Sequence, residues 1–594
     1  MSHINFTFSS SKSKSVFSNL PAAHGFASGW FISWPQGMSY LAWQNLLVRV
    51  LWFIGSKRYL RRLKNRTTVS QRKAFCAKEP QKNELVQTQI KAIVNGIETA
   101  QGAKEDIKLE LITMLKQFSE RKHLSQHIDA TIPDRRNQDL TTYSKQSIVM
   151  AALAIFLLRM SSGNKFDEAS HDKDERYSTT NMAKFIGAPE DRVPAIKTIE
   201  KFLKNLKESS VNDLLILFFK DLQQSKFFKH HSNIMPGDFF LLAADCVHTH
   251  TYDHPHHTDM DGNNDCPCCL KRVYNRGTEN EKVRWVHNTL VFCFVFMGGL
   301  KIPVYRYPIH AKQIRNLEDA SEDAYKQECE LVALKTALPT IVQEFPKTKI
   351  VLLLDGLYAS RPVIQLMQEQ RCGYIIVRKD GCLTSLAKEC DEHANSPNHK
   401  KNCVKHCQRE INGWLINERH AWFNTIYLGD GITTNVLRFC ETKTKEGKRT
   451  ESYKCEWLFS WRLSASTCEL ASRQARARWG VEDLFNTLKN RDFELKHDFS
   501  RDPRSCFNWQ GLTLLAFGIF ELFRFSENVE QRGVLPQSTL AAKLLGQLLH
   551  RPTEELFSEK QLSKRIQFRY HFIVEKIQSK IISLHDFEHK MRTG

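Results

Sequence analysis

Two aspartates stand where apolar stretches of the chain end. Asp245 follows the run FLLAA and Asp355 follows the run KIVLLL, and both runs have the composition of buried β-strands. A buried carboxylate costs free energy unless a cation or a hydrogen-bond donor meets it. One such aspartate is more often a turn or helix-capping residue, but two on strands of one sheet predict a shared site.

The third acid of interest is Glu482, in the sequence RARWGVEDLFNTLKN, which predicts a helix. Arg478 precedes Glu482 by four residues and Lys489 follows it by seven, so the three side chains share one helical face. The neighbouring Asp483 points about 100° away from that face. A surface ion pair without a functional role has the same spacing and contributes well under about 1 kcal/mol to stability. The helix sequence alone therefore does not distinguish such an ion pair from part of a functional site.

The two strand-end aspartates and the helix motif R-W-G-V-E-x-x-F-x-x-L-K together resemble the DDE transposases of bacterial insertion sequences. The nearest group has the signature Y-x2-R-x3-E-x6-K, which Arg478, Glu482 and Lys489 match. Ala475 stands at the tyrosine position, where the group is thought to hold a DNA phosphate, so that contact is expected to be arranged differently here. The resemblance covers about residues 140–530.

The resemblance implies a fold and a reaction. The fold is an α/β, ribonuclease-H-like mixed sheet with a β-rich insertion, flanked by helical N- and C-terminal regions. The reaction is cleavage of insertion-sequence ends and strand transfer into target DNA, with Asp245, Asp355 and Glu482 as catalytic residues that bind two Mg²⁺ ions, which Mn²⁺ can replace. Carboxylate oxygens suit Mg²⁺, and an ion pair activates the attacking oxygen and stabilises the leaving one. Arg478 and Lys489 would contact DNA phosphates.

The coarse pattern of the chain predicts how these parts are arranged. Strands are expected at 238–248, 285–297, 300–309, 349–354 and 373–379, and one long helix is expected from Ser464 to Asn490. The expected domains are a basic, partly disordered DNA-binding segment (1–78), a helical region for DNA ends (79–235), the first part of the catalytic core (236–380), a β-rich insertion (381–463), the catalytic helix (464–495) and a helical C-terminal region (496–594).

The charge distribution supports a polyanionic partner. The chain of 594 residues has a net charge of +20, and no acid precedes Glu79. Lys and Arg crowd together in this first segment, so DNA-phosphate contacts are expected from Arg58, Arg61, Arg62 and Lys64. The implied partners are double-stranded DNA, at the element ends and the target, and further copies of the chain in a homo-oligomer.

Residues 25–48 bear on whether the protein associates with a membrane. They carry no charge and could span a bilayer by length, but Pro35 and Gly37 interrupt them. A packed or interfacial aromatic segment is therefore favoured, with no stable membrane association. Sixteen cysteines are too sparse for a disulfide scaffold. They predict reduced thiols in a cytoplasmic protein, associated with the bacterial nucleoid.

A loop after Asp245 is rich in metal-binding side chains. Cys266 and Cys269 have the x2 spacing of zinc sites, and His254 and His257 are the expected partners for a structural Zn²⁺. The alternative is a flexible loop with free thiols. A weaker set of the same kind comprises His399, Cys403, His406 and Cys407.

Three other functions compete with a transposase. A DNA nuclease of the same fold would cut DNA without joining it. A non-catalytic DNA-binding protein derived from a transposase would bind DNA and leave it intact. A membrane-surface protein would use residues 25–66.

Replacing Arg58, Arg61, Arg62 and Lys64 by neutral residues is expected to weaken DNA binding and flatten its salt dependence. Each phosphate contact adds about 0.9 to the slope of log affinity against log salt concentration. Base discrimination should suffer less, because phosphate contacts position a protein without reading the sequence. Fluorescence anisotropy over a range of salt concentrations measures both. An unchanged affinity and slope after deletion of residues 1–78 would contradict the assignment and transfer DNA binding to the helical region.

Overall fold

The computed structural model describes residues 109–594, apart from 172–176, 190, 261–263, 312–321, 412, 446–447, 492, 532–534, 573 and 575–594. The chain divides into two units after Lys108, and every described residue belongs to the second, Leu109–Gly594. The predicted basic segment and the aromatic stretch 25–48 therefore lie outside the described residues.

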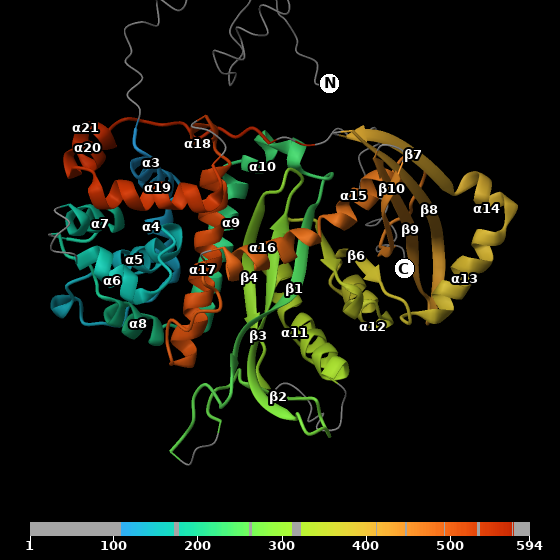
Figure 1. Cartoon of the computed structure of the whole chain (residues 1–594), viewed down its shortest axis with the longest axis horizontal. Coiled ribbons are helices and arrows are strands. Elements are labelled where there is room, and N and C mark those ends of the chain that lie inside the picture. Colours follow the sequence, from blue (N-terminus) through green and yellow to red (C-terminus); the bar gives the residue numbers. More distant parts are fainter. Residues whose placement is uncertain are drawn as a thin grey trace, which may run out of the picture. The chain divides into compact units, whose positions relative to one another are not determined.

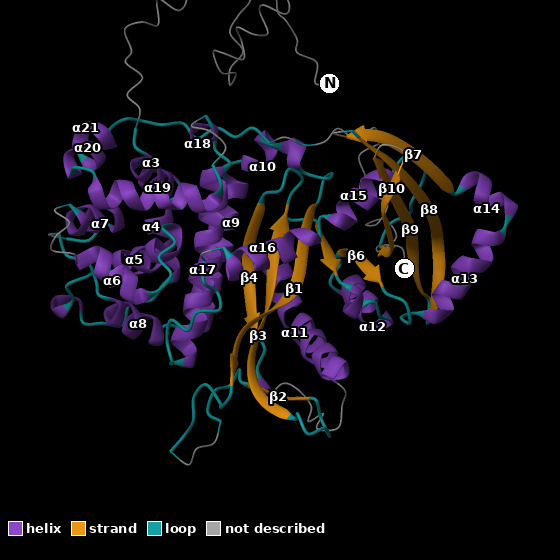
Figure 2. Cartoon of the chain, viewed as in Figure 1, coloured by secondary structure: helices purple, strands orange, loops and turns teal. Residues whose placement is uncertain are grey.

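The predicted mixed α/β class is confirmed, since the described strands form one ten-stranded mixed sheet surrounded by helices (Figures 1 and 2). Its central strands follow the order β4-β3-β1-β5-β6. They are β1 (Phe240–Tyr252), β3 (Lys282–Val295), β4 (Lys301–Pro308), β5 (Ile350–Leu354) and β6 (Gly373–Arg378). β3 pairs antiparallel with β1 and β4, whereas β5 runs parallel to β1 and β6. All five correspond to strands predicted from the sequence.

Burial explains why the apolar runs become central strands. β5 is buried along its whole length, as is typical of a parallel strand covered on both faces. β1 is buried from Leu241 to Ala244 and becomes partly accessible at Asp245. The sheet is covered by α11 (Glu322–Glu344), which packs against β3 and β4, and by α12 (Arg361–Glu369), which packs against β6.

The β-rich segment after β6 extends the same sheet. Its strands are β7 (Val404–Ile411), β8 (Trp414–Gly429), β9 (Ile432–Lys445) and β10 (Lys448–Phe459). Each pairs antiparallel with the next, and β10 pairs antiparallel with β6. Two short helices, α13 (Thr384–Asn395) and α14 (Pro397–Asn402), precede the four strands. This segment and the central strands therefore form one continuous layer (Figure 2).

One further strand, β2 (Leu270–Tyr274), was not expected from the sequence. It pairs antiparallel with the first residues of β3, beyond the region where β3 pairs with β4. β2 thereby adds a strand beside β3 at the end of the long β1–β3 pair that carries the Cys/His loop.

Helices from both ends of the described chain pack together (Figure 1). The earlier ones are α3 (Leu111–Arg121), α4 (Leu124–Thr131), α5 (Lys145–Leu157), α6 (Gly163–His171), α7 (Ser178–Ile186), α8 (Ile196–Lys204), α9 (Glu208–Gln224) and α10 (Phe227–His230). The later ones are α17 (Pro503–Arg524), α18 (Glu527–Glu530), α19 (Gln537–His550), α20 (Thr553–Phe557) and α21 (Glu559–Leu562). Short 3-10 turns lie at Gln138–Leu140, Ser232–Ile234 and Gly356–Tyr358.

Helix α17 holds these helices to the sheet. It packs against α5, α8, α9 and β4, and the buried Asn508 side chain donates a hydrogen bond of 2.9 Å to the carbonyl oxygen of Leu203. Within the described chain, α17 is the one helix long and apolar enough to cross a membrane, and that apolar stretch is fully buried in the protein. Its composition therefore reflects a position in the core.

The predicted single helix from Ser464 to Asn490 is wrong. The structure has two helices, α15 (Cys468–Arg476) and α16 (Trp479–Asn490), separated by a turn at Ala477 and Arg478. Backbone hydrogen bonds around Arg478 join residues three apart, as in a tighter turn. The sequences of α15 and α16 both favour a helix, so the local sequence did not predict the break between them.

A glycine allows α16 to approach the sheet. A Cβ on Gly480 would lie 3.1 Å from Cγ1 of Val295 on β3, closer than most side-chain contacts. The first turn of α16, which carries Glu482, can therefore lie directly against the central strands.

Candidate active site

Asp245 and Asp355 lie side by side just beyond the paired residues of β1 and β5. Asp355 directly follows β5, as predicted, but the prediction that Asp245 ends a strand is wrong, because β1 continues past it to Tyr252 and pairs there with β3. The parallel pairing of β1 with β5 runs from Phe240 opposite Ile350 to Ala243 opposite Leu353. Continuing this register by two residues brings Asp245 level with Asp355, on strands about 4.8 Å apart. The Oδ1 atom of Asp355 also accepts a hydrogen bond of 2.9 Å from the backbone N–H of Leu357, so this carboxylate caps the turn that follows β5.

Arg478 connects Glu482 to Asp245. Its Nη2 atom donates a hydrogen bond of 2.6 Å to Oε1 of Glu482, and its Nη1 atom lies 3.9 Å from Oδ2 of Asp245. α16 packs against β1 and β3, which fixes the helix that carries both residues. The structure thus places Asp245 of β1, Asp355 after β5 and Glu482 of α16 near one another, close enough for Asp355 and Glu482 to affect the pKa of Asp245. Their oxygen atoms do not form a group within 4.8 Å of one another among the described residues.

The electrostatic environment of Asp245 reflects this arrangement. Burial, followed by the charge of Asp355, raises the pKa of its carboxyl to about 6, against the opposing effect of Arg478. Glu482 adds a smaller contribution in the raising direction. The ionised form of Asp245 is therefore unfavourable in the absence of another cation.

Two lysines lie beside the carboxylates. Lys489, on the last turn of α16, has a pKa lowered by burial and by Lys496, and Asp245 partly offsets that change. Lys379 follows β6, and its Nζ atom lies 3.3 Å from Oδ2 of Asp355. Sequence reasoning missed Lys379, although it follows an apolar strand just as the two aspartates do.

The other residues of the helix motif take separate positions. Asp483 pairs with Nζ of Lys301 on β4, so it is Glu482 of the two acids that meets Arg478. Ala475, at the tyrosine position of the signature, is buried. Aromatic rings near Arg478 come instead from Tyr453 of β10 and from Trp479, whose centroids lie 5.5 Å apart. Trp479 is 46% exposed, which is unusual for so large an apolar side chain.

The Cys/His loop forms a compact cluster on β3. The sulfur atoms of Cys266 and Cys269 lie 3.3 Å and 3.1 Å from Nε2 of His287. A ligand atom of His256 lies within 4.8 Å of the Cys266 sulfur and of the His287 ring nitrogen. The backbone N–H of His256 also donates a 3.2 Å hydrogen bond to the Cys269 sulfur. His256, Cys266 and His287 therefore form one group of possible metal ligands, and Cys269, in contact with His287, is a fourth candidate.

The predicted histidine partners of this cluster are wrong. His254 is exposed, and Nδ1 of the half-exposed His257 lies 3.3 Å from a carboxylate oxygen of Asp265. The side chain of His256 between them turns inward and is 2% exposed. His287 was overlooked because it lies within the apolar sequence of a strand.

The weaker Cys/His set is dispersed. Nε2 of His399 donates a 3.0 Å hydrogen bond to the carbonyl oxygen of Trp422, and the sulfur of Cys407 lies 3.8 Å from Oε2 of Glu469. Neither belongs to a metal-ligand group among the described residues. The predicted DNA contacts Arg58, Arg61, Arg62 and Lys64 lie outside those residues.

No family model matches this chain, and no curated protein matches it. The geometry of the described residues is therefore the basis for any functional conclusion.

Asp245→Asn is expected to stabilise the protein in buffer without divalent cations. Folding raises the pKa of Asp245 from 3.8 to about 6, so this carboxyl costs folding free energy increasingly as the pH rises through that interval. The expected gain in the free energy of unfolding is on the order of 1–3 kcal/mol at pH 8 and shrinks as the pH falls towards 4. Urea denaturation at several pH values measures it.

Asp483→Asn is the matched control, since Asp483 is 47% exposed and paired with Lys301. It should give no such gain. A less stable Asp245→Asn protein at pH 8 would contradict the electrostatic description of the site.

Proposed function

We propose that the chain is a DDE transposase, which cuts DNA at the ends of an insertion sequence and joins those ends to target DNA. The observation that carries the proposal is the proximity of Asp245, Asp355 and Glu482 at the point where β5 ends, with Arg478 between Asp245 and Glu482. Carboxylates brought together from separate elements are typical of a site for divalent cations.

The strand arrangement supports the same proposal. Three antiparallel strands followed by two parallel ones, in the order β4-β3-β1-β5-β6, fit a ribonuclease-H-like core. The strands β7 to β10 lie in the chain between Asp355 and Glu482, where such transposases carry a β-rich insertion.

The donor set fits Mg²⁺. Asp245, Asp355 and Glu482 offer only carboxylate oxygens, which this hard cation prefers. Burial and Asp355 raise the pKa of Asp245, so a cation here would satisfy a charge that Arg478 compensates only in part. When bound, a pair of such ions would activate the attacking oxygen and stabilise the leaving oxygen at phosphorus.

The chain's own cations position the DNA in this proposal. Arg478 holds Glu482 in the free protein, and its planar guanidinium can make two parallel hydrogen bonds to a phosphate. Lys489 is near Asp245 and Lys379 contacts Asp355, and both would contact phosphates as single charges. Exposed Trp479, beside Tyr453, offers an aromatic surface to DNA where the signature tyrosine is missing.

Replacing Asp245, Asp355 or Glu482 by Ala should abolish DNA cleavage that depends on Mg²⁺ and leave DNA binding largely intact. Each replacement removes a cation ligand and no predicted phosphate contact. The substrate is a plasmid that carries the gene with its native flanking DNA, because the element's ends are expected there. Gel analysis of cut and joined products measures the reaction, and a mobility-shift assay measures binding.

Asp483→Ala is the matched control, one residue from Glu482 and paired with Lys301, and it should cut normally. Joined products distinguish a transposase from a nuclease of the same fold, which would only cut. Binding without any cleavage by the wild-type protein would favour a non-catalytic DNA-binding protein. An active Glu482→Ala protein would remove Glu482 from the site.

A further inference from the structure

We propose that Cys266, Cys269, His256 and His287 bind one structural Zn²⁺. The proposal is independent of the transposase assignment, because these ligands lie on a different part of the chain from the three carboxylates. His287 of β3 pairs with His250 of β1, which is five residues from Asp245 along the strand. That spacing corresponds to about 16 Å in an extended strand.

The distances suit a tetrahedral zinc site. Zinc binds thiolate sulfur at about 2.3 Å and imidazole nitrogen at about 2.0–2.1 Å, so neighbouring sulfur and nitrogen ligands in a tetrahedron lie about 3.5 Å apart. The two sulfurs lie 3.3 Å and 3.1 Å from Nε2 of His287. Both distances are close to the value expected between two ligands of one zinc ion.

Burial without partners is the second observation that points to a ligand. Cys266, Cys269 and His287 are each at most 1% exposed. Within the described part of the chain, both ring nitrogens of His256 are buried without a hydrogen-bond partner. Burying polar atoms in this way costs free energy, and coordination of a cation by one of these nitrogens would offset part of that cost.

The ligand types select zinc. Two thiolates and two imidazoles form the Cys2His2 set of structural zinc sites, whereas Mg²⁺ prefers oxygen ligands. The described cysteines are free thiols, so the two sulfurs are available as ligands. A Cys266–Cys269 disulfide is the competing state, and it would leave the histidines without a metal.

A carboxylate lies behind one of the ligands. Oδ1 of Asp498 is 3.7 Å from Nε2 of His256, which would leave Nδ1 of that ring for the metal. Such a carboxylate orients a ligating histidine and raises its affinity for zinc. Asp498 belongs to the segment between α16 and α17. The site would thus connect β3 and the segment between β1 and β2 to the residues that follow the Glu482 helix.

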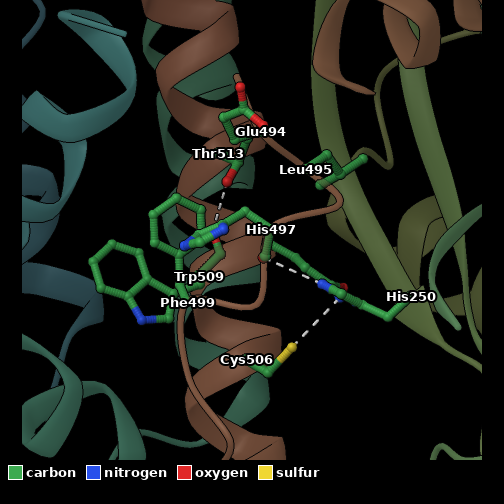
Figure 3. A pocket seen from close by; sticks show the side chains of 9 residues that line it. His250, Glu494, Leu495, His497, Phe499, Cys506, Trp509 and Thr513 are labelled. Carbon is green, nitrogen blue, oxygen red and sulfur yellow. Dashed lines mark hydrogen bonds between the residues drawn. The ribbon is translucent and has the colours of Figure 1, made fainter. Parts of the chain in front are cut away.

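A second group of possible metal ligands lies next to the cluster, and the two groups share a residue. His250, His287 and Cys506 form a second buried group of metal-ligand atoms, but it shares His287 with the first. Figure 3 shows that His250 reaches towards His497, to whose carbonyl oxygen its Nε2 donates a 3.2 Å hydrogen bond. The four-ligand set around Cys266 is therefore the more complete one.

Full-length protein purified without chelators is expected to contain about one zinc per chain by mass spectrometry of metals. X-ray absorption at the zinc edge should give two sulfur and two nitrogen ligands. Cys266→Ser combined with Cys269→Ser should remove the zinc. Protein without zinc, or an intact mass that shows a Cys266–Cys269 disulfide, would overturn the proposal.

A matched pair of histidine variants keeps the test decisive if the cysteine variant does not fold. His256→Asn should lose zinc, whereas the neighbouring control His257→Asn should retain it. Asp498→Asn should weaken zinc binding by about 10–100-fold without abolishing it. Zinc retained in the His256→Asn protein and lost from the His257→Asn protein would contradict the ligand set.

Discussion

The parallel pairing of β1 with β5 is the contact on which the candidate site depends. It brings Asp245, inside β1, level with Asp355, directly after β5, although the two aspartates are distant in the chain. The buried residues of β5 and of β1 up to Ala244 hold this pairing in the core. Because side chains alternate between faces, a shift of one residue between β1 and β5 would move Asp245 relative to Asp355 and to Glu482 on α16.

Placing Asp245, Asp355 and Glu482 near one another costs folding free energy, and neighbouring positively charged side chains reduce that cost. Arg478 contacts two of the carboxylates and Lys379 contacts the third. The pKa of Asp245 nevertheless stays raised, because burial and Asp355 outweigh Arg478. The negative charge of these carboxylates is therefore only partly compensated, and a divalent cation bound there would compensate it further.

The strands and the acids could be predicted from local patterns, whereas contacts made across the sheet could not. The apolar runs before Asp245 and Asp355 predict buried strands, and the four-residue spacing predicts the contact of Arg478 with Glu482. The inward turn of His256, instead of its neighbours, depends on how the loop folds over β3. His287 joins the cysteines because β2, which begins directly after Cys269, pairs with β3 next to His287. The break before α16 likewise depends on packing, since Gly480 lies against Val295.

Anomalous diffraction from crystals grown with Mn²⁺ tests the central claim most directly, because this ion can be located apart from the protein atoms. Mn²⁺ is expected to be bound by oxygen atoms of Asp245, Asp355 and Glu482, with Arg478 moved away from Glu482 or turned to an anion. Crystals with millimolar Mn²⁺, no metal at these carboxylates and an unchanged pairing of Arg478 with Glu482 would contradict it.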